Sequence, residues 1–201
     1  MNNKRIDLEL ITSLVDKKMR VLDVGCGNGE LLQSLKTKND VIGQGLELKQ
    51  ERVNQCVEKG LSAIQGDADK DLSLYPDQSF DCVILSQTIQ ATGDPKLILK
   101  ELIRIGKKAI VSIPNFGYWR VRLSLGINGR MPRTKKLIYN WYDTPNIHLC
   151  TILDFINLCN ELNIQIEKTI TLSSNNNKSF NGLPNKLSNL FSEEAIFLIK
   201  S

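Results

Sequence analysis

Three closely spaced glycines stand where an apolar run gives way to an amphipathic pattern, in VLDVGCGNGELL between Val21 and Leu32. Gly25 permits a tight turn, Gly27 lets the backbone approach a ligand, and Gly29 lets the next helix pack against the strand. The N-terminus of that helix would present free N–H groups and a partial positive charge. We therefore expect a ligand-binding turn between a buried strand and a helix.

The spacing of these glycines and a nearby acid indicate the kind of ligand. The pattern is GxGxG rather than the GxGxxG of NAD enzymes, and Asp23 precedes the first glycine by two residues. A carboxylate at the strand tip suits an ammonium group better than a pyrophosphate. S-adenosylmethionine (SAM) has an amino-acid tail and no phosphate. The pattern therefore favours SAM, or its demethylated product S-adenosylhomocysteine, over a redox enzyme that uses NAD.

Further candidate cofactor contacts follow the next strands predicted along the chain. Glu47 stands about 20 residues after the first glycine, the position at which an acid accepts hydrogen bonds from ribose hydroxyls in such folds. Asp67, in QGDAD, is placed to read the adenine amino group, and Ser86 and Gln87 would line the other side of the cofactor. Alone, Glu47 fits a solvated strand end and Asp67 a helix cap. Together these residues fall at the carboxyl ends of successive strands, where ligands bind in open α/β sheets.

The cysteines and the single histidine argue against other kinds of site. The five cysteines are odd in number and form no CxxC pair, so we expect neither a disulfide framework nor a metal site. Cys26 lies in the glycine turn near a helix N-terminus, which could lower its pKa, but a small side chain that fits the turn is the simpler interpretation. His148 is interpreted as a hydrogen-bonded structural residue rather than a general base.

Short β-rich runs alternate with amphipathic helical patterns, which predicts a mainly parallel sheet covered by helices. The expected strands are 21–24, 41–48, 63–65, 80–86, 108–113, 164–172 and 195–199. The expected helices are 6–15, 30–36, 50–59, 95–105 and 151–162, with a helical turn near 119–125. These elements predict a Rossmann-like, seven-stranded α/β domain in three layers over residues 1–201. The Asn- and Ser-rich stretch 173–189 is expected to be a long flexible loop.

The segment 116–150 differs from the scaffold in charge and aromatic content. Its first part, 116–142, holds six basic and no acidic residues, both tryptophans and three of the four tyrosines. We interpret the segment as either a lid over the cofactor or a docking surface, because arginine, tryptophan and tyrosine are enriched at interface hot spots. Nucleic-acid binding is the least favoured interpretation, since the segment has no known nucleic-acid motif and the net charge is only +4.

Longer stretches of the chain resemble a known family. Besides the glycine turn, these are FDCVILSQTIQA (80–91), IVSIPNFGYWRVRL (110–123), GRMP (129–132) and WYDTPNIHLCTI (141–152). In this order, over nearly the whole chain, they resemble the methionine biosynthesis protein MetW family. The resemblance implies a fold of the class I SAM-dependent methyltransferase type and a link to methionine synthesis from homoserine. The chain departs from the expected pattern at Asn28, where an acidic residue is common.

The resemblance also implies a partner. Proteins of this family accompany homoserine O-acyltransferase, MetX, and are thought to support its activity. The resemblance marks family-specific residues without assigning their roles. As candidate contacts with a substrate or partner, it indicates Asn115, Trp119, Arg120, Arg122, Trp141 and His148.

Two functions follow from these patterns. The first is an accessory subunit that needs or senses SAM and acts on MetX; the alternative is a SAM-dependent methyltransferase acting on an unidentified small molecule. No Asn-Pro-Pro-aromatic motif and no histidine follow the fourth predicted strand, which favours the first, while the intact cofactor pattern keeps the second open. Without a signal-peptide pattern or an apolar run of about 20 residues, we expect a cytoplasmic protein that does not span a membrane.

Overall fold

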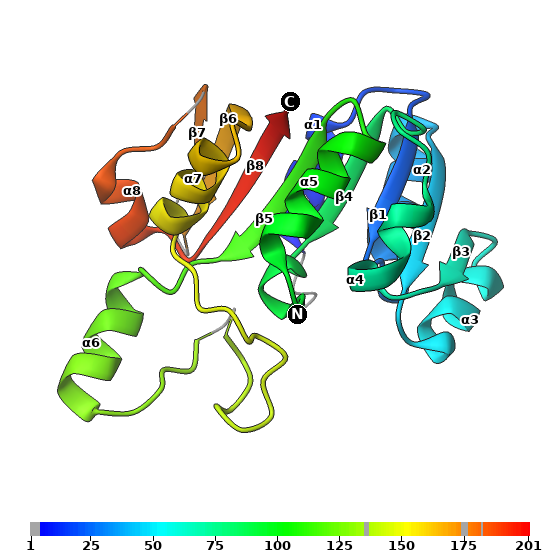
Figure 1. The fold of residues 1–201 in the computed structure, drawn as a ribbon. Coiled ribbons are helices and arrows are strands. Elements are labelled where there is room, and N and C mark those ends of the chain that lie inside the picture. The colour runs from blue at the N-terminus through cyan, green and yellow to red at the C-terminus, as the bar shows by residue number, and fades with distance from the viewer. Residues whose placement is uncertain (1–4, 135–136, 174–176, 182) are drawn as a thin grey trace.

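The computed structural model describes residues 5–134, 137–173, 177–181 and 183–201. Figure 1 shows a sheet between two layers of helices. The strands are β1 (Arg20–Val24), β2 (Ile42–Glu47), β3 (Ser62–Gln65), β4 (Cys82–Ser86), β5 (Ala109–Pro114), β6 (Gln165–Leu172), β7 (Asn177–Asn181) and β8 (Glu194–Lys200). The helices are α1 (Ile6–Leu14), α2 (Glu30–Asn39), α3 (Gln50–Glu58), α4 (Ala68–Asp71), α5 (Pro95–Ile105), α6 (Trp119–Asn128), α7 (Ile152–Glu161) and α8 (Lys186–Phe191), with short 3-10 helices η1 (Leu72–Leu74) and η2 (Ile89–Ala91).

The strands lie in the order β3-β2-β1-β4-β5-β8-β6-β7. The first five are parallel, whereas β8 runs antiparallel to both β5 and β6. The predicted Rossmann-like sheet in three layers is confirmed. The carboxyl ends of β1, β2 and β4 therefore meet at one edge of the sheet, where the candidate cofactor residues were expected.

The stretch 173–189 departs from the sequence prediction. Its described residues include β7, which pairs antiparallel with β6 and adds an eighth strand at the edge of the seven predicted ones. They also include the start of α8, whose N-cap Asn185 accepts a hydrogen bond from the backbone N–H of Ser188 at 2.9 Å. The prediction of a long loop is therefore wrong for these parts, while 174–176 and 182 lie outside the described residues. A polar composition suppresses the strand signal, but the free edge of β6 supplies hydrogen-bond partners that the sequence pattern does not reveal.

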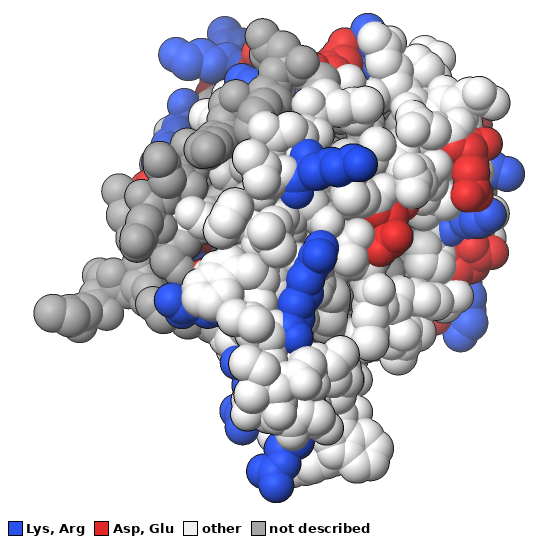
Figure 2. All heavy atoms as spheres, turned by 90° about the vertical axis from the view of Figure 1, so that its left-hand side faces the viewer, with Lys and Arg blue, Asp and Glu red and all other residues white. Residues whose placement is uncertain are grey.

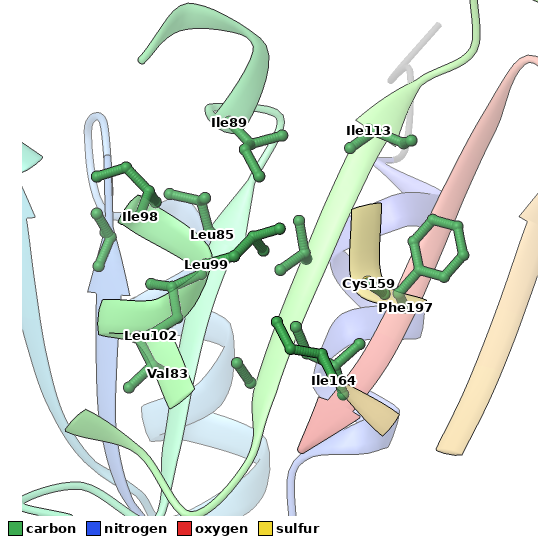
Figure 3. Close-up of a cluster of buried hydrophobic side chains, with 14 of the residues drawn as sticks. Val83, Leu85, Ile89, Ile98, Leu99, Leu102, Ile113, Cys159, Ile164 and Phe197 are labelled. Carbon is green, nitrogen blue, oxygen red and sulfur yellow. The ribbon is translucent and has the colours of Figure 1, made fainter. Parts of the chain in front are cut away.

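Two apolar clusters fill the spaces on the two faces of the sheet. One packs α1 and α2 against the sheet, and the other packs α5 and α7 against the opposite face. Figure 3 shows the second cluster, in which Leu99 and Leu102 of α5 lie beside Val83 and Leu85 of β4. Both residues of α5 are completely buried. Apolar burial on both faces holds the strands in place, so their carboxyl ends form a rigid platform.

The segment between β5 and α7 leaves the main body of the molecule. Figure 1 shows α6 and the chain that follows it projecting beyond the carboxyl ends of the parallel strands. The helical turn expected at 119–125 is present, and α6 continues to Asn128. Among the described residues of this projection, Tyr118, Val121 and Leu137 form a small separate cluster of buried side chains. Most described residues of the segment are exposed or half-buried. Two of its six basic residues, Lys135 and Lys136, lie outside the described residues.

Candidate functional site

The glycine turn follows β1 directly and leads into α2. Gly25, Gly27 and Gly29 all have positive φ angles, of 72°, 58° and 81°. At Gly25 a Cβ atom would lie 2.7 Å from Oγ1 of Thr88, so the loop after β4 closes tightly on the turn. At Gly27 a Cβ atom would meet no atom within 4 Å. The turn is thus packed at Gly25 and open at Gly27, which is the arrangement expected where a backbone approaches a ligand.

Glu47 ends β2 beside this turn and is only 5% exposed. Its Oε2 accepts a hydrogen bond from the backbone N–H of Gly27 at 2.9 Å, and its Oε1 accepts one from the N–H of Lys49 at 3.1 Å. The guanidinium of Arg52 lies 3.9 Å from the same carboxylate. A carboxylate accepts about four hydrogen bonds, so these contacts leave capacity for ligand hydroxyls. The sequence indicated the position of Glu47 but not its bond to the turn.

Asp23 lies in β1, the strand that pairs with β2, and is 2% exposed. Burial, and then the negative charge of Glu47, raise the pKa of Asp23 to about 8. A cationic group beside this carboxyl would favour its charged form and lower the pKa again. Asp23 therefore suits an ammonium ligand, and its contact with the cofactor stays a prediction.

Cys26 lies in the glycine turn and is 7% exposed. Burial, then the charges of Asp23 and Cys56, raise the pKa of the Cys26 thiol well above its usual range. The thiol therefore stays protonated and lacks the thiolate character of a nucleophile. A Cβ at Gly45 would lie 2.5 Å from its sulfur, so Cys26 fits closely against β2. The structure supports the interpretation of Cys26 as a small packing residue.

Asp67 follows β3, but its carboxylate has local partners. It caps α4 by accepting a hydrogen bond from the N–H of Asp69 at 3.1 Å, and Lys70 lies 3.1 Å from its other oxygen. Its side chain is 31% exposed, so it can also meet a ligand at the surface of the site. The helix-cap interpretation is therefore correct, and the adenine contact stays a prediction.

Ser86 is the last residue of β4 and Gln87 follows it, and both form hydrogen bonds to the neighbouring strands. The hydroxyls of Ser86 and Ser112 lie 3.1 Å apart, and the N–H of Gln87 donates to Oγ of Ser112 at 3.0 Å. Nε2 of Gln87 donates to Oε1 of Glu194 at 2.8 Å. Gln87 has a φ of 50°, a left-handed conformation that is uncommon for a residue with a side chain. Glu194 is completely buried at the start of β8, and no local sequence signal marked it.

Asn115 is a structural residue in this fold. Its Nδ2 donates to the carbonyls of Asn189 and Ser192, both at 2.7 Å, and its Oδ1 accepts from the N–H of Gly117 at 2.8 Å. The side chain is buried, with the residue 1% exposed. These bonds tie the end of β5 to α8 and leave Asn115 no contact to offer. Its selection as a substrate or partner contact is therefore corrected.

The remaining candidates from the resemblance are not gathered into one site. Arg120 lies over the ring of Trp119 at 5.3 Å, while Nε of Arg122 donates to the carbonyl of Gly117 at 2.6 Å. Trp141 is 74% exposed. The backbone N–H of His148 donates to the carbonyl of Gln90 at 3.0 Å, which places His148 beside the loop after β4. The structure thus separates exposed Arg120 and Trp141 from the more internal His148.

No group of three or more metal-binding side chains occurs among the residues that the structure describes. In the same part of the chain, none of the helices is both long enough and apolar enough to cross a bilayer.

The fold and the site define the class of protein. The structure of a SAM-dependent methyltransferase, possible histamine N-methyltransferase, from Thermotoga maritima matches with a TM-score of 0.68, at 16% identity over 97% of this chain and 87% of that one. The structure of the [4+2]-cyclase SpnF matches with a TM-score of 0.66, at 16% identity over 98% and 80% of the two chains. The protein has the fold of class I SAM-dependent methyltransferases.

The sequence identifies the family within this class. The family model for the methionine biosynthesis protein MetW matches residues 5–199, and the chain belongs to this family. A curated relative, the bifunctional methionine biosynthesis protein MetXA/MetW of Rhodopirellula baltica, is 33% identical over 174 residues. That match covers 82% of this chain and 28% of the relative, so the chain spans less than a third of the relative's length. The family predicted from the sequence motifs is confirmed.

Proposed function

We propose that this protein binds SAM, or S-adenosylhomocysteine, at the turn after β1 and acts as an accessory partner of a MetX-type homoserine O-acyltransferase. The open space beside Gly27 and the buried carboxyls of Asp23 and Glu47 at the ends of the neighbouring strands support the first part of the proposal. A relative whose name joins MetXA and MetW in one chain carries the second part. In that relative the two parts are held close together by one chain, at high effective concentration. This supports the proposal that the corresponding separate chains act together.

Each proposed cofactor contact uses a polar group with free capacity. Asp23 would pair with the ammonium group of the amino-acid tail, and Glu47 would accept hydrogen bonds from the ribose hydroxyls. Asp67, at the exposed end of β3, would accept from the adenine amino group. Bound SAM supplies an activated methyl group, while the chain's own contribution is to hold the cofactor in a fixed position.

Calorimetry with the purified full chain tests the cofactor proposal. We expect SAM and S-adenosylhomocysteine each to bind at one site and NAD not to bind, because the site offers carboxylates rather than a pyrophosphate cradle. Folded wild-type protein that binds neither SAM nor S-adenosylhomocysteine would refute the proposal.

The docking surface that we propose is the projecting segment 116–150. It exposes large apolar side chains, with exposed fractions of 76% for Ile127, 74% for Trp141 and 71% for Tyr142. Arg120 and Arg133 are exposed in the same segment, and Figure 2 shows basic side chains along this projecting part of the molecule. Apolar anchors surrounded by positive charge suit a partner surface that is apolar with an acidic rim.

A pull-down with MetX and an acyltransferase assay, each with and without this protein, test the partnership. We expect wild type to bind MetX and raise its rate. Trp141→Ala and Arg120→Ala should each weaken the complex, by about thirtyfold if the residue contributes about 2 kcal/mol at the centre of the interface. Leu74→Ala is the matched control, because Leu74 is 78% exposed but lies outside the segment.

The outcomes separate the partner from the surface. Wild type that neither binds MetX nor changes its rate refutes the accessory function. Wild type that binds, with Trp141→Ala and Arg120→Ala binding equally well, retains the partner and refutes the segment 116–150 as the docking surface.

The second candidate function is a SAM-dependent methyltransferase acting on a small molecule. The Thermotoga maritima protein that shares the fold is described as a possible N-methyltransferase, which favours this function, while the fold of SpnF belongs to a cyclase. Incubation with isotope-labelled SAM and small-molecule extracts distinguishes the two. Labelled product that depends on Glu47 supports methyl transfer, whereas unchanged SAM together with activated MetX supports the accessory function.

A further inference from the structure

A cavity of about 170 Å³ lies between the N-terminal turns of α5 and α7, outside the glycine turn. Figure 1 shows these two helices on the same face of the sheet, and Figure 3 shows Ile89 beyond Leu85, near the carboxyl end of β4. The apolar walls are formed by Ile89, Pro95, Cys150, Phe155 and Leu158. Asp154 also lines the cavity, and its Oδ2 accepts hydrogen bonds from the backbone N–H and the hydroxyl of Thr151. Ile89 and Phe155 are each 3% exposed, so this part of the wall is a well-packed surface.

Two polar atoms at this cavity are buried without a hydrogen-bond partner among the described residues. Gln90 is 3% exposed, and its Nε2 donates to the carbonyl of Gln87 at 2.8 Å, which fixes the orientation of the amide. Oε1 of Gln90 is therefore the atom left unpaired, and Nε2 of His148 is the second. Both residues line the cavity, and the N–H of His148 holds them together by donating to the Gln90 carbonyl. Buried polar atoms in native proteins nearly always have a hydrogen-bond partner, so we expect these two atoms to bond to a ligand or to water.

The size and lining of the cavity define that partner. An apolar cavity of about 150 Å³ in a protein core takes up benzene, so about 170 Å³ accommodates a single ring or a short branched chain. Water alone would leave the apolar walls of the cavity without apolar contacts. A hydroxyl group can donate to an amide oxygen such as Oε1 of Gln90 and accept from an imidazole N–H such as that at Nε2 of His148.

We propose that this cavity is a binding site for a compact apolar molecule that carries one hydroxyl group, of about the size of phenol. The hydroxyl bonds to Gln90 and His148, and the apolar part packs against Phe155 and Leu158. The site is separate from the cofactor contacts but close to them in the chain. Thr88, two residues before Gln90, is the residue that packs against Gly25. The proposal does not depend on SAM binding.

Phenol and toluene are the probes that test the site, because they match in size and differ in the hydroxyl group. Calorimetry and two-dimensional NMR of the full chain should show one site for phenol, with shifts at Ile89 and Leu158. We expect toluene to bind about fivefold to tenfold more weakly, since it leaves both polar atoms unpaired. Gln90→Leu should weaken phenol binding by a similar factor and should not weaken toluene binding.

A second variant, in α7, tests whether the ligand occupies the volume of the cavity. Leu158→Phe should fill the cavity from α7 and abolish binding of both probes. Leu153→Phe is the matched control, because Leu153 is a partly buried leucine of the same helix that does not line the cavity. Circular dichroism and thermal melting must show that each variant is folded. If Gln90→Leu does not fold, the comparison of the two leucine variants decides alone.

Three results would overturn the proposal. The first is no binding of phenol to folded wild type, which would mean that the cavity holds only water. The second is equal affinity for phenol and toluene, which would remove the role of the polar pair. The third is unchanged phenol binding in folded Leu158→Phe, which would place the ligand elsewhere.

Discussion

Oε2 of Glu47 and the backbone N–H of Gly27 form a hydrogen bond of 2.9 Å across the carboxyl ends of β2 and β1. The residue before Glu47 reinforces this join, because the carbonyl of Leu46 accepts from the N–H of Gly25 at 2.7 Å. The turn is thus held from the second strand by both backbone and side chain. A ligand at Gly27 would meet a carboxylate that is already positioned, so less ordering entropy is lost on binding.

Removal of the Glu47 carboxylate should weaken cofactor binding. Glu47→Ala leaves polar groups of the bound ligand unpaired, and we expect a loss of about 1–3 kcal/mol in SAM affinity by calorimetry. Glu47→Gln keeps one acceptor oxygen and should lose less. Glu51→Ala, at an exposed position of α3, is the control and should bind like wild type. Equal SAM affinity of wild type and Glu47→Ala would contradict this role.

Substitutions at two glycines with similar backbone conformations distinguish the effect of backbone strain from the effect of a lost ligand contact. Gly27 and Gly60 have φ angles of 58° and 68°, and a Cβ at either would meet no atom within 4 Å. Alanine at either position should therefore cost a similar amount of stability, about 1 kcal/mol, through backbone strain alone. Only Gly27→Ala should also weaken SAM binding, because its methyl group would enter the ligand's space. Urea unfolding and calorimetry on both variants measure the two effects, and equal SAM affinities would place the ligand away from Gly27.

The stability of the unliganded protein should fall as pH rises from about 4 to about 8. The pKa of Asp23 is raised from 3.8 to about 8 in the folded state, so within this window the folded chain holds a proton that the unfolded chain has released. Unfolding then releases a proton, and raising the pH favours it until the folded carboxyl also ionises. The effect should level off above about pH 8.

Asp23→Asn supplies the control for this pH dependence. The amide does not titrate, so urea unfolding between pH 5 and pH 8.5 should show a smaller decline than in wild type. SAM binding to wild type should strengthen with pH over the neutral range, since a cationic ammonium favours the ionised carboxylate. A decline of equal size in both proteins would assign the pH dependence to other groups.

Loss of the Asn115 side chain should destabilise the fold rather than a binding surface. Asn115→Ala leaves the buried carbonyls of Asn189 and Ser192 unpaired, and we expect a loss of about 2–4 kcal/mol in the free energy of unfolding. Chemical denaturation measures it, and Asn128→Ala, at the exposed end of α6, should change stability little. Under conditions where the variant is folded, MetX binding should be unchanged. A stable variant that fails to bind MetX would reverse the assignment.

The sequence alone determined the parts of this protein that rest on local patterns. The strand, glycine turn and helix around Gly25–Gly29 could be predicted because their periodicity and glycine spacing lie within a dozen residues. The same holds for the order of strands and helices, which implies a parallel sheet and brings Asp23, Glu47 and Asp67 to its carboxyl edge. Motifs spread along the chain identified the family.

Only the tertiary structure decided which of these residues meet. Gln87 and Glu194 are 107 residues apart in the sequence and hydrogen-bonded at 2.8 Å, and no periodic pattern relates them. The buried bonds of Asn115 reach residues 74 and 77 positions away, so its role could not be read from its neighbours. The strand β7 forms because β6 presents an edge. Gln90 and His148, each with one unpaired buried atom, line a cavity together with residues of α7, which lie more than 60 positions from Gln90 in the sequence. Such contacts depend on how distant elements pack, which local sequence patterns do not encode.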